Sequence, residues 1–97
     1  MLADGFDWDD GNRLKCSKHG VPIEDIEYVM RNAPLVAPDY AHSRHEDRYI
    51  AIGRSRHGRS VFVAFTYRHR NGHFLVRPIS ARYMHAKEIA RHGRYQS

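Results

Sequence analysis

The first third of the chain has hydrophobic residues at helical spacing. The pattern predicts two helices, over about residues 10–18 and over residues 23–31. Asp9 or Asp10 can cap the first helix, and Gly20 can end it in a left-handed conformation. The apolar positions of the second helix are Ile23, Ile26, Val29 and Met30. Because they recur every three or four residues, they define an amphipathic helix that buries one face.

The second half of the chain is rich in β-branched and aromatic residues, which favour strands. Three strands are predicted, over residues 48–54, 60–68 and 73–82. Asn71-Gly72 is a typical tight-turn pair, so the last two strands are expected to form a hairpin within an antiparallel meander. Pro78 lies inside the last strand and lacks an N–H group, which predicts an edge position or a β-bulge there.

Shorter segments complete the predicted order of elements. Phe6 and Trp8 alternate with acidic residues, as in a short strand or an extended arm. Residues 35–38 suggest an edge strand, residues 39–47 are polar and are expected to form a loop, and residues 84–91 suggest a terminal helix.

This order of elements indicates the fold class. Helices come first, a consecutive antiparallel sheet follows, and a short helix ends the chain. We therefore expect an α+β fold with the helices packed on one face of the sheet. The length fits a single domain over residues 1–97.

Charge is distributed unevenly between the two halves of the chain. The net charge is +5, but residues 1–47 contain five Lys or Arg against ten Asp or Glu. Residues 48–97 contain eleven Lys or Arg, of which only Lys87 is lysine, against a single acid, Glu88. Arg suits phosphate because its planar fork can donate two hydrogen bonds to one group. The second half is therefore expected to bind nucleic acid, although a solvated basic face with no special partner is the simpler alternative.

Composition also bears on compartment and cofactor. Cys16 is the only cysteine, which excludes an internal disulfide and fits a reducing, cytoplasmic location. No apolar run approaches the roughly 20 residues of a membrane span, and the acidic first ten residues do not match a secretory leader. His42 and His45 have no further ligand pair at zinc-like spacing, so neither a metal nor another cofactor is expected.

Several short segments occur in an order that is typical of one protein family. They are Phe6-Asp7-Trp8-Asp9, Asn12, Lys18-His19-Gly20-Val21, residues 48–54, Ile79-Ser80-Ala81-Arg82 and Lys87-Glu88. Together they resemble the BrnT family, and the match extends from about Phe6 to Arg94. The chain departs from the family pattern at residues 83–86, where further basic residues are common, and at the two histidines of the loop over residues 39–47.

The resemblance implies a fold, an activity and two partners. The fold is that of RelE-like microbial ribonucleases, with N-terminal helices packed on a small antiparallel sheet. The activity is that of a ribonuclease toxin of a type II toxin–antitoxin system, which cleaves RNA without a metal and inhibits translation. The partners are the RNA substrate and a BrnA-like antitoxin that binds the toxin and represses their shared operon. Whether the chain alone forms a homodimer is left open.

Arg54 and Arg82 are the first candidates for a phosphate clamp. Each ends a predicted strand and lies in a segment that resembles the family. A strand end holds a side chain on a rigid frame, where preorganised positive charge stabilises a transition state. The alternative is an arginine that merely ends a strand in solvent.

His19 is the candidate general acid or base. An unperturbed imidazole has a pKa of about 6.5, which suits proton transfer near neutrality. The structural alternative is that His19 only interacts with the exposed carbonyls at the end of the first helix. Lys18 has the same two interpretations, as an RNA-phosphate contact or as a helix-terminal cation.

Glu88 is either a general base or a residue that orients Arg82 or Lys87 through an ion pair. We favour the orienting role, because Arg82 and Glu88 are separated in sequence only by a turn. Lys87, Arg68 and Arg77 are candidate contacts to the RNA backbone.

Two other classes of function fit the same composition. One is a non-catalytic nucleic-acid-binding module, in which the arginines bind phosphate and no residue transfers protons. The other is a protein-interaction domain whose basic surface meets an acidic partner, a role that an antitoxin would also satisfy.

Overall fold

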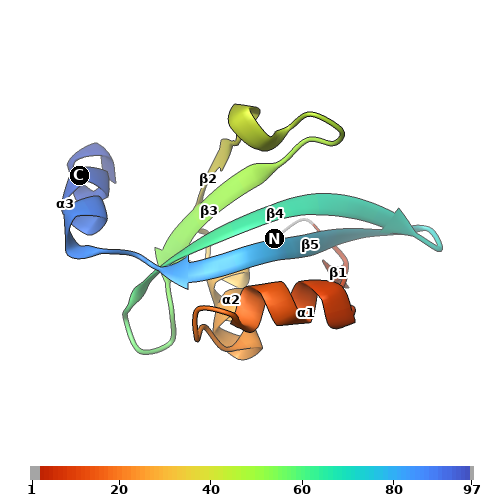
Figure 1. The fold of residues 1–97 in the computed structure, drawn as a ribbon, viewed down its shortest axis with the longest axis horizontal. Coiled ribbons are helices and arrows are strands. Elements are labelled where there is room, and N and C mark those ends of the chain that lie inside the picture. Colours follow the sequence, from red (N-terminus) through yellow and green to blue (C-terminus); the bar gives the residue numbers. More distant parts are fainter. Residues whose placement is uncertain (1–2, 97) are drawn as a thin grey trace.

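The computed structural model describes the backbone of residues 3–96 and the side chains of residues 3–91 (Figure 1). The elements in chain order are β1 (Gly5–Phe6), α1 (Asp10–Ser17), α2 (Ile23–Arg31), β2 (Leu35–Pro38), a short 3₁₀ helix η1 (Tyr40–His42), β3 (Tyr49–Arg54), β4 (Ser60–Arg70), β5 (His73–Tyr83) and α3 (Ala86–Gln96). The architecture is α+β, as predicted, with the short β1 before the first two helices, the other strands after them and a terminal helix.

The five strands form one sheet in the order β1-β5-β4-β3-β2. The three strong strands form the predicted antiparallel meander, and β2 adds to its edge. The expectation of a wholly antiparallel sheet is wrong, because β1 pairs parallel to β5. Only Gly5 and Phe6 make this pairing, opposite Leu75 and Val76. A strand of two residues has too little alternation to indicate its partner or its direction.

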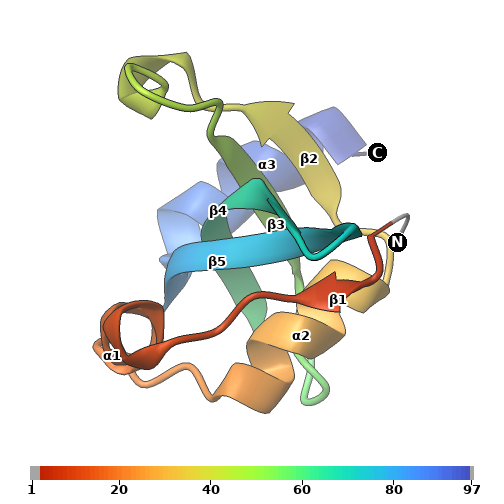
Figure 2. The same ribbon diagram turned by 90° about the vertical axis from the view of Figure 1, so that its right-hand side faces the viewer.

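Helices α1 and α2 cover one face of the sheet. On the opposite face, the open face, the loop after η1 covers Thr66, which is 3% exposed and donates to the Asp47 carbonyl at 2.6 Å. Helix α1 contacts β5, and α2 contacts β3 and β4; Figures 1 and 2 show both helices on the same side of the sheet. The buried core between these layers consists of Cys16, Val21, Ile26, Val29, Met30, Ala51, Val61, Val63, Phe65, Val76 and Ala81. Because side chains alternate along a strand, the neighbours of these core residues in β4 and β5 point to the open face.

Several local predictions are confirmed, and others need adjustment. Asp9 caps α1, and Gly20 has the left-handed φ of +83° that the sequence suggested. Pro78 lies at a β-bulge, since the pairing register shifts between Ala64 and Phe65. The loop over residues 39–47 contains the 3₁₀ helix η1, and α3 begins at Ala86, two residues later than expected.

Asn12 connects three elements through its buried side chain, which is only 4% exposed. Its Nδ2 donates to the carbonyl oxygens of Asp7 and Pro78, each at 2.9 Å, and its Oδ1 accepts from the N–H of Asp9 at 2.7 Å. Asp9 returns a bond by accepting from the N–H of Asn12 at 3.0 Å, which completes a capping box. The arm after β1, the start of α1 and the bulge of β5 are therefore fixed to one another.

We expect Asn12→Ala to lower the free energy of unfolding by about 2–4 kcal/mol, because it leaves buried carbonyl groups without a donor. Urea unfolding followed by the fluorescence of Trp8, the single tryptophan, measures the change. Ser17→Ala is the matched control, since Ser17 is exposed and makes one side-chain bond within the same helix. Equal stability of the two variants would contradict the connecting role of Asn12.

Candidate functional site

Arg82 lies on the open face of the sheet at the end of β5. Its neighbour Ala81 is buried in the core, so alternation turns Arg82 to the other face. Arg82 pairs across the strands with Phe62, and its guanidinium carbon lies 4.6 Å from the centre of the Phe62 ring. The aromatic face thus supports one side of the cation. The Arg82 side chain remains 35% exposed, so a ligand can reach it.

The guanidinium of Arg82 makes a two-pronged contact with Glu88. The two terminal nitrogens donate to the two carboxylate oxygens at 2.7 and 2.8 Å. This side-chain hydrogen bonding raises the pKa of Arg82, against the opposing effect of partial burial. The expected contact between Arg82 and Glu88 is present, and Glu88 does not use Lys87 in its place.

Glu88 is itself held in place by the start of α3. The backbone N–H of His85 donates to a Glu88 oxygen at 2.9 Å, and the N–H of Ile89 donates to the carbonyl of His85 at 3.0 Å. His85 therefore occupies the N-cap position and Glu88 the third position of the helix, the spacing at which a carboxylate caps a first turn. One carboxylate caps α3 and aims Arg82 at the same time.

The hydrogen bonds from Arg82 and from the His85 N–H lower the pKa of Glu88 from 4.5 to about 2. A carboxylate with so low a pKa stays ionised at neutral pH and is a weak base. Its chemistry suits a group that orients a cation better than one that removes a proton.

Arg54 lies on the same face as Arg82, with β4 between them. It ends β3 opposite Ser60, and its closest polar contact is a long one of 3.5 Å to the carbonyl of Gly58. Hydrogen bonds hold the following loop, because the buried Ser55 hydroxyl accepts from two backbone N–H groups of that loop. A 2.7 Å bond from Arg56 to the buried Asp25 fixes the loop to α2. Arg54 therefore extends from a rigid base into solvent.

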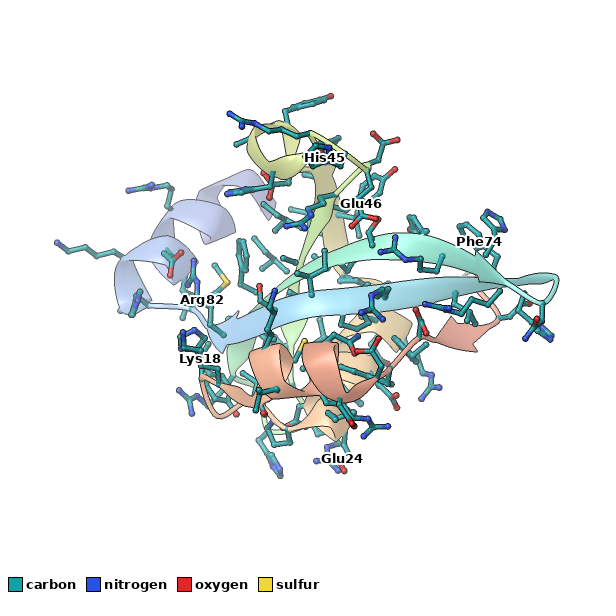
Figure 3. The ribbon with its side chains drawn as sticks, turned by 45° about the vertical axis from the view of Figure 1, so that its right-hand side comes forward. Lys18, Glu24, His45, Glu46, Phe74 and Arg82 are labelled. Atoms are coloured by element: carbon teal, nitrogen blue, oxygen red, sulfur yellow. The ribbon has the colours of Figure 1, made fainter. Side chains whose placement is uncertain are left out.

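Lys18 and His19 follow α1 and are exposed. Figure 3 shows Lys18 and Arg82 at the same end of the molecule. Lys87, in the first turn of α3, is also exposed. Within the described part of the chain, no ion pair includes Lys18, Arg54 or Lys87. This end of the sheet thus combines an oriented arginine with basic groups that an anion can approach.

The structure places Arg68 and Arg77 at the other part of the open face, toward the β4–β5 turn. Arg77 lies 3.1 Å from Asp7 and 3.0 Å from Asp9, and only 18% of its side chain is exposed. Arg68 pairs with Glu46, and this hydrogen bond lowers the pKa of the Glu46 carboxyl. Both arginines have carboxylate partners inside the fold, so an RNA phosphate must share or displace them.

Phe62 is one of the alternating strand aromatics for which the sequence allows either a core position or a base-stacking one. It alternates with the buried Val61 and Val63 and therefore faces the other way, toward Arg82. His85 was not predicted from the sequence, and its signal was the three-residue spacing to Glu88 that is typical of a helix cap.

The described residues contain no cluster of three or more His, Cys, Asp or Glu side chains that could hold a metal ion. Burial raises the pKa of the Cys16 thiol to about 11, so it is not a nucleophile near neutrality. None of the helices described is long and apolar enough to cross a membrane.

We expect the Glu88 carboxyl to titrate near pH 2 in the folded protein. Its pKa is lower folded than unfolded, so its stabilisation of α3 is present above about pH 4.5 and is lost as the pH falls toward 2. Carbon-13 NMR of the carboxyl group measures the midpoint. Arg82→Ala is expected to raise this midpoint toward 4.5, and an unchanged midpoint would contradict the contact as its cause.

Comparison with known proteins agrees with the resemblance seen in the sequence. The family model described as "Ribonuclease toxin, BrnT, of type II toxin-antitoxin system" matches residues 8–88. The matched region runs from just before α1 to Glu88 and includes Arg54 and Arg82. No curated protein sequence matches the chain. Because the family model covers most of its length, the chain belongs to the BrnT family of ribonuclease toxins of type II toxin–antitoxin systems.

Proposed function

We propose that the chain is an endoribonuclease of RelE-like architecture that cleaves RNA without a metal and so inhibits translation. The observation that carries the proposal is Arg82 on the open face, aimed by Glu88 and supported by Phe62. Arg54 extends from the same face, from a base held by hydrogen bonds. Fixed positive charge beside an open surface is what a phosphoryl-transfer transition state requires.

In the proposed reaction the RNA supplies its own nucleophile. A base takes the proton of the 2′-OH, the 2′ oxygen bonds to the adjacent phosphorus, and the bond from phosphorus to the 5′ oxygen breaks. An acid then protonates the departing 5′ oxygen. The products are a 2′,3′-cyclic phosphate and a 5′-hydroxyl end, so the reaction needs no water, oxidant or further reactant.

Arg82 and Arg54 would bind the non-bridging oxygens of the phosphate that reacts. The contact with Glu88 uses one N–H of each terminal nitrogen of Arg82, and the remaining N–H groups are available to phosphate. Because Glu88 fixes the plane of the guanidinium, less orientational freedom is lost when the phosphate binds. In this scheme Glu88 is a positioning residue and Arg82 a catalytic one.

His19 and His85 are the candidates for proton transfer. His19 is exposed at the end of α1, and His85 is exposed beside the Arg82–Glu88 contact. His85 adjoins the Arg82–Glu88 contact, because its backbone N–H donates to Glu88 at 2.9 Å. The two imidazoles come from different elements, so they could approach the phosphate from opposite sides as base and acid.

Lys18, Lys87, Arg68 and Arg77 would contact the flanking RNA backbone. Arg68 and Arg77 line a pocket of about 230 Å³ together with further basic side chains. An RNA strand bound along the open face would thus contact positively charged side chains at both ends of β5. Membership of a type II system implies an antitoxin protein as second partner, and we propose a BrnA-type antitoxin that covers this basic face.

The second candidate function is binding of nucleic acid without cleavage. The exposed Lys18, Arg54 and Lys87 are the observation that favours it, because contacts to RNA phosphates need positive charge and no proton transfer. Scission of RNA separates the two functions.

Purified protein with EDTA is expected to cut a labelled RNA to fragments that end in 2′,3′-cyclic phosphate. Arg82→Ala is expected to lower the rate about 100- to 1000-fold, as the loss of one preorganised donor does elsewhere. Arg31→Ala removes the same charge from an exposed site on α2 and is the matched control. Circular dichroism confirms that both variants fold. RNA that stays intact, with and without added ribosomes, would overturn the enzyme in favour of the binding module.

Glu88→Gln is expected to slow cleavage less than about tenfold. Glutamine can still accept from the His85 N–H and cap α3, while its contact to Arg82 weakens. A general base would instead contribute about 10²- to 10⁴-fold and the ascending limb of the pH–rate profile. The profile of Glu88→Gln therefore distinguishes the roles: an unchanged ascending limb supports positioning, and its disappearance assigns the base to Glu88.

A further inference from the structure

A hollow lies at the edge of the sheet where β3 extends past β2. The first residue of β2, Leu35, is opposite Ile52, so the last two residues of β3, Gly53 and Arg54, have no strand beside them at this edge. The end of α2, the loop after β3 and the start of α3 surround the gap. The resulting pocket has a volume of about 490 Å³, within the usual range of roughly 300–1,000 Å³ for small-molecule sites.

The walls of this pocket combine apolar surface with hydrogen-bonding groups. The apolar part comes from Leu35, Ile52, Met84 and Ile89, and the polar side chains include Asn32 and Ser60. Among all the described residues that line it there are two arginines and no Asp or Glu. Such a lining suits a flat, partly apolar group attached to a negative charge.

The backbone of Arg54 adds a donor and an acceptor at the same edge. Asp39 N–H donates to the carbonyl of Arg48 at 2.8 Å, so the backbone groups of Arg48 point toward β2. In an antiparallel ladder every second residue points the same way, which includes Ile52 and Arg54. Because β2 begins opposite Ile52, the N–H and C=O of Arg54 have no strand partner and face the pocket edge.

The pocket is one nucleotide unit away from Arg82. Leu35, Ile52, Phe62 and Arg82 form a row across four strands, each paired with the next. Two strand spacings, roughly 10 Å, therefore separate Ile52 in the pocket wall from Arg82. A nucleotide spans a comparable distance from its phosphate to the far edge of its base, and Arg54 lines the pocket two residues after Ile52 on the same strand.

We propose that this pocket receives the unpaired RNA base next to the phosphate that Arg82 and Arg54 bind. The inference rests on the proposed ribonuclease function and extends it to substrate selection. The apolar walls contact the ring faces of the base, and Asn32, Ser60 and the Arg54 backbone hydrogen-bond to its edge, as in recognition of single-stranded RNA. Cleavage then depends on the identity of the base beside the scissile bond.

Binding of nucleoside 3′-monophosphates to the full chain tests the pocket, with ribose 5-phosphate as the probe that lacks a base. At least one of the four nucleotides is expected to bind about tenfold more tightly than ribose 5-phosphate, since a stacked base contributes roughly 1–3 kcal/mol. Leu35→Ala is expected to remove this advantage and to leave the affinity for ribose 5-phosphate unchanged. Ile89→Ala, on α3, is a second variant that leaves the sheet intact. Leu14→Ala truncates the same type of side chain on the far side of α1, where it is 75% exposed, and serves as control.

The outcomes separate this inference from the ribonuclease function. Equal affinity for the nucleotides and ribose 5-phosphate overturns the pocket, as does an unchanged base preference of RNA cleavage in Leu35→Ala and Ile89→Ala. Cleavage that persists in those variants with the same base preference supports the ribonuclease function and rejects the base-binding role of the pocket. If the pocket binds nucleotides but the protein cuts no RNA, the base-binding site is supported and the ribonuclease function is rejected. Variants that weaken only antitoxin binding assign the pocket to the protein partner and overturn the proposal.

Discussion

Burial of one face of β4 is the constraint on which the rest of the molecule depends. Val61 and Val63 must contact the helices, so Phe62 between them must face away. Phe62 then provides an aromatic surface at the point where β5 brings Arg82 across from it. The hydrophobic effect thus determines the position of the catalytic candidate without any polar interaction, and the polar contacts refine its direction.

The acidic first half of the chain divides the arginines of the second half into two groups. Toward the β4–β5 turn, Asp7 and Glu46 neutralise Arg77 and Arg68. At the other end of the sheet, Arg82 pairs instead with Glu88, which belongs to the same half of the sequence. In Figure 3, Glu46 lies well away from Arg82. The uneven charge distribution is therefore partly a structural device, because some of the excess positive charge is used to hold the N-terminal arm.

The sequence could predict the elements whose periodicity is long, and the contact whose partners are near in sequence. The helix over residues 23–31, the three-strand meander and the Arg82–Glu88 contact all belong to this class. The parallel pairing of β1 could not be predicted, because two residues carry no register information. The pocket beside Arg54 could not be predicted either, since it arises from the unequal lengths of two neighbouring strands.

The Glu88 carboxylate makes two interactions, and each depends on the other. It accepts from the His85 N–H, which begins α3, and from both terminal nitrogens of Arg82. By reciprocity of coupled equilibria, whatever unwinds the first turn of α3 also loosens the aim of Arg82, and whatever draws Arg82 away from Glu88 weakens the cap. The first turn of α3 and the orientation of Arg82 are therefore coupled through one carboxylate, so a partner that binds this turn would change the direction of Arg82 without contacting it.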